Sequence, residues 1–179
     1  MELYDDVLSE EDFHTLTDTV LHNKNIFGWQ WDDDVAYPDD IICEDLNNYQ
    51  LSHTFFFLGP NCDPIYKSPH FNLIIPLIKF QPLKLDYPLR IKANLNVRTE
   101  KIIKHGFHID NPMSNSKTAI FYLNDSDGYT EFEESGKKVQ SKANRLCVFP
   151  TPIRHSGTTC TNTKRRVVIN INYIPKETK

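Results

Sequence analysis

The sequence lacks the features of membrane and secreted proteins. No apolar run approaches the ~18 residues that a membrane span requires, and no basic segment followed by an apolar run marks a secretory leader. The cysteines form no CxxC pair and no zinc-ribbon spacing, so a thiolate metal site or a disulfide framework has little support. We therefore expect a cytoplasmic protein without a membrane partner, in which the cysteines are free thiols: Cys43, Cys62, Cys147 and Cys160.

An excess of positive charge is also missing. The net charge is -4, whereas nucleic-acid binding normally needs a basic surface. Aspartate runs at 32–34 and 39–40 make the N-terminal half acidic, and nucleic acid is therefore not an expected partner. Because no internal repeat, low-complexity segment or linker divides the 179 residues, we predict one domain over residues 1–179.

Two segments of the N-terminal half carry helical signals. Ser9 precedes three acidic residues and is placed as an N-cap; the apolar residues after it repeat at helical spacing, which predicts a helix packed on a sheet. A second apolar stripe predicts a helix over residues 69–80. Residues 26–63 are acidic, aromatic and irregular, and no element can be assigned there. Within this stretch, we expect Trp29 and Trp31 to pack against other residues rather than to contact a ligand.

The pattern changes to period two after residue 88. Apolar and polar residues alternate over residues 89–98, as in a strand with one apolar and one polar face. The polar face either meets solvent or looks into a pocket through Asn94 and Asn96. Short strands separated by turn signals are typical of a β sandwich or barrel. Further strands are predicted over residues 102–109, 119–123, 129–133, 145–149 and 166–173.

Three residues form the pattern of a metal site. His108 and Asp110 lie two positions apart, so both side chains project from one face if this segment is a strand or the end of one. His155 follows the strand predicted at 145–149. Two imidazoles and one carboxylate are the facial ligand set of Fe(II) oxygenases, so iron is the predicted metal. A zinc hydrolase is disfavoured because no second Glu or His nearby stands out as a general base.

An arginine pair opens the last predicted strand. A guanidinium at this place could form two parallel hydrogen bonds with a carboxylate. By strand phase, Arg166 shares the inward face with Asn170, whereas Arg165 faces the other way. A surface arginine beside a turn is the plain structural alternative. In combination with the three predicted metal ligands, the pattern favours Arg166 as the partner of a carboxylate.

Short motifs along the C-terminal half point to one enzyme family. They lie at residues 108–112, 120–124, 128–132, 144–149, 155–157 and 166–170. Together they resemble the 2-oxoglutarate/Fe(II)-dependent oxygenases of the prolyl 4-hydroxylase type, and especially the small members encoded by bacteriophages. The resemblance implies a mainly β protein with flanking helices, built as a double-stranded β-helix (a cupin-like jelly roll). Residues 89–174 would form this core, and residues 1–88 a helical or irregular part.

The resemblance also implies roles for individual residues. It makes His108, Asp110 and His155 the catalytic iron ligands. Arg166 becomes the partner of the 2-oxoglutarate C5 carboxylate, with Arg165 as the fallback. The further predicted 2-oxoglutarate contacts are Tyr122, which aligns with a tyrosine of the family, and Asn94 and Asn170, which share the inward face.

The resemblance implies a dioxygenase that uses Fe(II), 2-oxoglutarate and O₂, hydroxylates a substrate and releases succinate and CO₂. A peptidyl prolyl residue is the first candidate substrate, and a free amino acid or other small molecule is compatible. The motif Gly128-Tyr129 replaces the usual Gly-Gly, and Arg166 stands where collagen-type enzymes have Lys, which weakens any transfer of substrate identity. The alternatives are a non-catalytic metal- or carboxylate-binding β-barrel module and a nucleic-acid base dioxygenase. The oligomeric state stays open, and a phage protein would act in the host cytoplasm.

Overall fold

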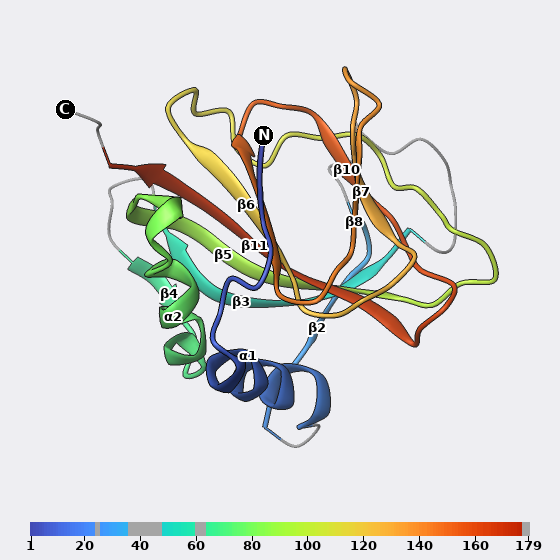
Figure 1. Cartoon of the computed structure of the whole chain (residues 1–179), viewed down its shortest axis with the longest axis horizontal. Helices are drawn as coiled ribbons and strands as arrows, with labels where there is room; N and C mark the ends of the chain where they lie inside the picture. The colour runs from blue at the N-terminus through green and yellow to red at the C-terminus, as the bar shows by residue number, and fades with distance from the viewer. Residues whose placement is uncertain (24–25, 36–47, 60–63, 177–179) are drawn as a thin grey trace.

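The computed structural model describes residues 1–23, 26–35, 48–59 and 64–176, which are built mainly from strands (Figure 1). The larger sheet has eight strands in the order β1-β9-β6-β11-β5-β3-β2, with β4 also paired to β3, and the smaller sheet has the order β10-β7-β8. Every pairing between these strands is antiparallel. The strands are β1 (Glu2–Tyr4), β2 (Gln30–Asp32), β3 (Gln50–Leu58), β4 (Pro64–Lys67), β5 (Leu85–Val97), β6 (Lys117–Tyr122), β7 (Tyr129–Phe132), β8 (Lys138–Gln140), β9 (Arg145–Pro150), β10 (His155–Gly157) and β11 (Arg165–Pro175).

The larger sheet buries one apolar face beneath the helices. In β11, Val167, Ile169 and Ile171 are fully buried and belong to the main core together with Leu16 of the first helix. Figure 1 shows α1 and α2 on the side of this sheet away from β7, β8 and β10. Because strand residues alternate between faces, the other residues of β11 are left to face the smaller sheet. A second apolar cluster there consists of Ile120, Tyr122, Phe132, Val139, Cys147, Phe149 and Val168.

The first helix agrees with the prediction. Helix α1 (Glu10–Thr17) begins after Ser9, whose side chain caps the first turn, and a π-helical turn, η1 (Asp18–His22), continues it. The ring of Phe13 meets Phe121 of β6 edge-on at 6.1 Å. The predicted N-cap and the packing of this helix on the sheet are therefore confirmed.

The second predicted helix, over residues 69–80, is wrong as a single element. The segment divides into a 3₁₀ turn, η3 (Phe71–Ile74), a short α2 (Ile75–Ile78) and a further 3₁₀ turn, η4 (Gln81–Leu83). Pro76 lies in the first turn of α2. Since proline has no N–H to donate and its ring clashes with the preceding turn, a continuous α-helix cannot pass through this position.

The strand predicted over residues 102–109 is also wrong. This segment forms only isolated bridges. His105 N donates to Gly157 O, and His108 N donates to His155 O. Between these two hydrogen bonds, one segment has two residues (106 and 107) and the other has one (156). The extra residue interrupts the ladder as a bulge does, so the segment is extended without being a regular strand.

The region before residue 89 contributes more to the sheet than the sequence indicates. Strand β3 lies beside β5, and β5 itself starts at Leu85. A register shift between Thr54 and Phe56 breaks the alternation in β3, since an extra residue moves the following side chains to the other face. The sequence of β3 therefore shows no clean period of two.

The structure tests the expectations about cysteines and membrane spans only for the described residues. Cys147 and Cys160 are buried free thiols, as predicted, whereas Cys43 and Cys62 lie outside the described residues. In the described parts of the chain, no helix has the length and apolar character needed to cross a membrane.

Candidate metal and co-substrate site

Two histidines face each other across a short backbone pairing. His108 and His155 exchange backbone hydrogen bonds of 3.0 Å in both directions, and their ring centroids lie 4.8 Å apart. Their Nδ1 atoms lie 3.1 Å from the carbonyl oxygens of Gly106 and Ile153. Each Nδ1 therefore carries the proton and donates it, which leaves the Nε2 lone pair for a metal ion. The two Nε2 atoms lie 3.9 and 3.6 Å from the carboxylate oxygens of Asp110.

A buried carboxylate completes this group. The Asp110 side chain is 3% exposed, and the ligand atoms of the three residues lie within 4.8 Å of one another. Asn170 Nδ2 donates to both carboxylate oxygens at 3.0 Å, and Arg90, Thr118 and Asn172 each donate at 3.2 Å. These donors fix the orientation of the carboxylate. The three residues that the sequence singled out are thus brought together in a geometry that could hold a metal ion.

The surroundings also set the charge of these groups. Burial alone would raise the pKa of Asp110, but His155, Arg90, His108 and the hydrogen bond from Asn170 outweigh it and hold the pKa at about 2. Burial lowers the pKa of His155. The carboxylate is therefore ionised and the imidazole neutral near pH 7, which are the forms that bind metal ions.

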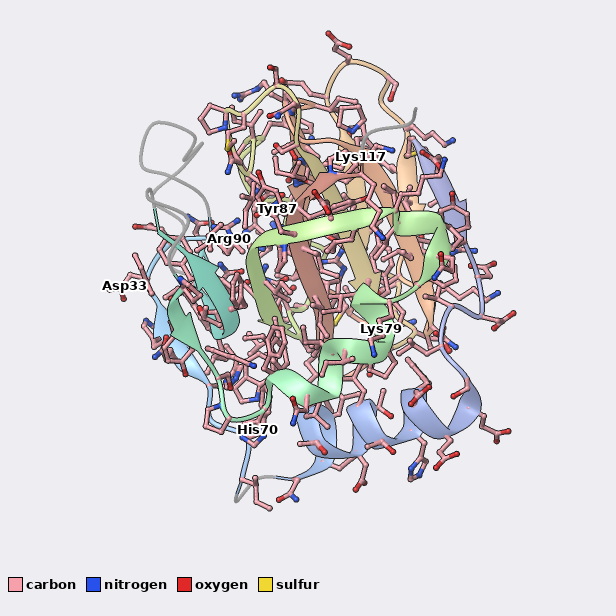
Figure 2. The ribbon with its side chains drawn as sticks, turned by 90° about the vertical axis from the view of Figure 1, so that its left-hand side faces the viewer. Asp33, His70, Lys79, Tyr87, Arg90 and Lys117 are labelled. Carbon is pink, nitrogen blue, oxygen red and sulfur yellow. The ribbon has the colours of Figure 1, made fainter. Side chains whose placement is uncertain are left out.

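The three residues open into a cavity of about 540 Å³. Residues of both sheets line it, so it lies between them. The polar face of β5 forms part of its wall, and the pocket explanation of that face is confirmed. Figure 2 shows Arg90 and Asp33, two of the lining residues, on the same flank of the molecule, with Asp33 at the outer edge. The β5 residues in the wall are Arg90, Lys92, Asn94 and Asn96.

A buried arginine lies in the wall of the same cavity. Arg166 is 2% exposed; its Nε donates to Ser141 Oγ at 2.7 Å and its Nη2 to Thr130 Oγ1 at 3.0 Å. Burial lowers the pKa of Arg166, yet a guanidinium stays protonated at neutral pH. No carboxylate of the described residues forms an ion pair with it. A buried guanidinium without an acidic partner is a site for an anion.

Thr130 is a site residue that the sequence reasoning missed. Its Oγ1 accepts hydrogen bonds from Arg166 and from the Tyr122 hydroxyl, the latter at 2.9 Å. A hydroxyl has two lone pairs and one proton, so the proton remains to be donated, and Thr130 lines the cavity. Tyr122 itself is fully buried behind it, with the Arg166 guanidinium 5.6 Å above its ring. The inward phase of Thr130 in β7 was the available signal.

The lack of a side chain at Gly128 leaves room for Arg166. A Cβ atom on Gly128 would lie 2.6 Å from Arg166 Cδ and 2.6 Å from the Thr159 carbonyl oxygen. A Cβ on Gly157 would lie 3.5 Å from Arg166 Nη1, an ordinary contact. The glycine at position 128 is therefore required by close approach to the arginine, which the sequence alone did not reveal.

The other predicted residues fall in different places. Arg165 does not line the cavity; its Nη2 donates to the carbonyl oxygen of Leu21, so the opposite strand phase of the two arginines is confirmed. Asn94 lies in the cavity wall, and its buried Oδ1 has no hydrogen-bond partner among the residues that the structure describes. Trp29 packs on the core, but Trp31 is 58% exposed and lines the cavity. The packing role predicted for Trp31 is therefore wrong.

Several solved structures share this fold, among them prolyl hydroxylases and an α-ketoglutarate-dependent epimerase. The non-haem α-ketoglutarate-dependent epimerase SnoN of nogalamycin biosynthesis is similar with a TM-score of 0.63 and 11% identity, over 97% of this chain and 77% of that one. A prolyl-4-hydroxylase of Pseudomonas putida has a TM-score of 0.58 and 11% identity, over 98% and 92%. A prolyl hydroxylase of Trichoplax adhaerens, in complex with a peptide of the hypoxia-inducible factor oxygen degradation domain, has 0.56 and 13%, over 97% and 82%.

No family model matches the chain, and no curated protein matches it. At identities this low, structural similarity supports a shared fold only. That fold agrees with the predicted mainly β architecture. The chain has the jelly-roll fold found in 2-oxoglutarate- and Fe(II)-dependent oxygenases.

Proposed function

We propose that this chain is a non-haem Fe(II)- and 2-oxoglutarate-dependent dioxygenase that hydroxylates a substrate. One observation carries the proposal: the candidate metal ligands and a buried arginine open into the same cavity. The ligands are His108, Asp110 and His155, and the arginine is Arg166, which has no acidic partner among the described residues. A metal site and an anion site in one cavity fit a co-substrate that chelates a metal at one end and carries a carboxylate at the other. The reaction would convert 2-oxoglutarate, O₂ and a C–H bond into succinate, CO₂ and a C–OH bond.

The donor set fits Fe(II). Two neutral imidazoles and one carboxylate are the facial ligands of non-haem iron oxygenases and leave coordination positions open. The carbonyl partners of both Nδ1 atoms and the donors around Asp110 hold the three ligand atoms in place. When bound, iron supplies the activation of O₂ and the oxidation of the substrate.

The chain's own residues hold the co-substrate in this proposal. Arg166 binds the distal carboxylate through parallel hydrogen bonds, and Thr130 donates its remaining proton to the same group. Tyr122 acts through Thr130 and the guanidinium rather than by lining the cavity. Asn94 offers its amide N–H to the co-substrate. Asn170 acts through Asp110, since its amide already donates to both oxygens of that carboxylate.

The cavity mouth favours a substrate other than nucleic acid. Its described rim includes three consecutive aspartates, at 32–34, which would repel a phosphate backbone. A peptide or a small molecule is the proposed partner, and a peptidyl prolyl residue, a kinship with phage-encoded members and a cytoplasmic location remain predictions. A non-catalytic binding module is the second candidate, but a complete ligand set with a free anion site favours turnover.

Succinate formation tests the proposal. The protein is incubated with 2-oxoglutarate, Fe(II) and air, and succinate is measured by mass spectrometry. We expect succinate above the metal-free background and its loss in Asp110→Ala. In Arg166→Ala the KM for 2-oxoglutarate should rise roughly 100-fold, because the distal carboxylate would be buried unpaired. Arg165→Ala is the matched control, and its KM for 2-oxoglutarate should stay unchanged. Unchanged succinate formation in Asp110→Ala would remove the oxygenase assignment.

A further inference from the structure

The mouth of the cavity presents an exposed aromatic ring beside carboxylates. Trp31 is 58% exposed and stacks on Tyr49 at 4.4 Å with an interplanar angle of 17°. Its indole Nε1 donates to Asp33 Oδ1 at 2.8 Å, and Asp34 also lines the cavity. The face of a fixed tryptophan next to negative charge is an arrangement that binds organic cations.

Apart from Arg166, which the proposed function assigns to 2-oxoglutarate, the other charged side chains of the described cavity wall have partners. Lys92 pairs with Asp32 at 2.8 Å, and the Arg90 guanidinium is directed at the carboxylate of the metal group. Asp33 and Asp34 are exposed and form no ion pair with any described residue. The charge that a ligand meets first at this mouth is therefore negative.

A buried acceptor deeper in the cavity also lacks a partner. Asn94 Oδ1 is the buried side-chain atom without a hydrogen bond among the described residues. Asn94 of β5 pairs with Ser52 of β3 on one side and with Val168 of β11 on the other. It therefore lies between strand β2, which carries Trp31, and strand β11, which carries Arg166. With both carboxyl groups ionised, 2-oxoglutarate has acceptors only and cannot donate to this oxygen. A further ligand of the same cavity can supply the missing donor, since buried polar groups are normally paired.

We propose that the substrate carries a cationic nitrogen group, an ammonium or a guanidinium, which lies against Trp31 between Asp33 and Asp34. A further N–H or O–H of the same substrate donates to Asn94 Oδ1. This inference rests on the proposed function, because it names the substrate class of that cavity. A basic amino acid and a basic side chain of a peptide share the required chemistry, and free and capped probes separate these two sources.

Indole NMR tests the inference without turnover. The full chain contains two tryptophans, so ¹⁵N-indole labelling gives two side-chain signals, and Trp31→Phe identifies the one from the mouth. The protein is loaded with Zn(II) and 2-oxoglutarate and titrated with N-acetyl-arginine methylamide and N-acetyl-lysine methylamide. The citrulline and norleucine analogues are the neutral matches, and free arginine and lysine form the second arm. We expect the cationic probes to shift the Trp31 signal and bind roughly tenfold more tightly than their neutral matches.

Charge and acceptor variants locate the contacts. Asp33→Asn keeps the oxygen that accepts from the Trp31 indole but removes the charge, and we expect roughly threefold weaker binding of the cationic probes. Asp86→Asn, an exposed aspartate of β5 that does not line the cavity, is the matched control and leaves binding unchanged. Asn94→Leu, which removes the acceptor, should weaken binding of the cationic probes at least tenfold. Because Asn94 also offers its N–H to the co-substrate, this titration is made at a 2-oxoglutarate concentration that saturates the variant.

Two outcomes overturn the inference. One is equal affinity for cationic and neutral probes; the other is cationic binding that is insensitive to both Asp33→Asn and Asn94→Leu. A complete lack of binding by every cationic probe, free or capped, also overturns it when 2-oxoglutarate still supports succinate formation, and in that case the proposed function stands. If 2-oxoglutarate supports no succinate formation and does not bind, the proposed function fails first.

Discussion

Replacing Gly128 with alanine tests the anion site through a single methyl group. The added Cβ would lie 2.6 Å from Arg166 Cδ and 2.6 Å from the Thr159 carbonyl oxygen, and 3.2 Å from Thr158 Oγ1. Carbon atoms normally pack at about 3.5 to 4.0 Å. Both contacts are too short to persist, so the Arg166 side chain must move by about 1 Å, and the backbone at Thr159 or at position 128 must shift as well.

The displacement has two expected consequences. Overpacking of this kind costs about 1–3 kcal/mol of the free energy of unfolding. In addition, Arg166 would lose its alignment with Thr130 and Ser141, and a shift of about 1 Å at a positioned group can cost ~100-fold in function. We therefore expect 2-oxoglutarate to bind 10- to 100-fold more weakly in Gly128→Ala.

Calorimetric titration of the Zn(II)-loaded protein with 2-oxoglutarate measures this affinity, and urea denaturation measures the stability. Gly28→Ala is the control, because a Cβ at Gly28 meets no atom within 4 Å, and both quantities should stay unchanged there. If Gly128→Ala folds normally and binds 2-oxoglutarate with the affinity of the unmodified protein, the position assigned to Arg166 in the anion site is refuted.

Three further perturbations have defined outcomes. Ser9→Ala removes the N-cap that accepts from the Asp12 N–H at 3.1 Å and should cost about 1 kcal/mol of the free energy of unfolding in urea. Tyr122→Phe removes one of the two donors to Thr130 and should cost about 1–2 kcal/mol in the same assay. Burial lowers the pKa of His53 below its usual 6.5, so the unfolded state binds its proton first as the pH falls. Thermal melts should show stability falling from pH 7 to pH 5.5, with a smaller fall in His53→Gln.

Local patterns predicted the elements that carry the chemistry. The period of two over residues 89–98 identified both faces of β5, and strand phase in β11 placed Arg166 inward and Arg165 outward. The metal group needed only the residue types and their order, although the strand predicted for His108 and Asp110 does not form. The residues meet because His108, in an irregular segment, exchanges a pair of backbone hydrogen bonds with His155.

What the sequence missed depends on contacts between distant segments. Thr130 gains its role from hydrogen bonds to Arg166 and Tyr122, which lie in two other strands. Trp31 resembles a core residue in the sequence, and only the position of β2 at the edge of the larger sheet exposes it at the cavity mouth. The bulge in β3 hides its alternation. Apart from the inward phase of Thr130 in β7, none of these features has a signature within a short window of sequence.

The most direct test of the proposed site is an anaerobic titration of the Fe(II)-loaded protein with 2-oxoglutarate, followed by visible absorption. Chelation of iron by the co-substrate at a site with open coordination positions gives a metal-to-ligand charge-transfer band. We predict a band that saturates at one 2-oxoglutarate per chain and is absent in Asp110→Ala. If the protein binds iron but no band forms at saturating 2-oxoglutarate, the oxygenase assignment is contradicted.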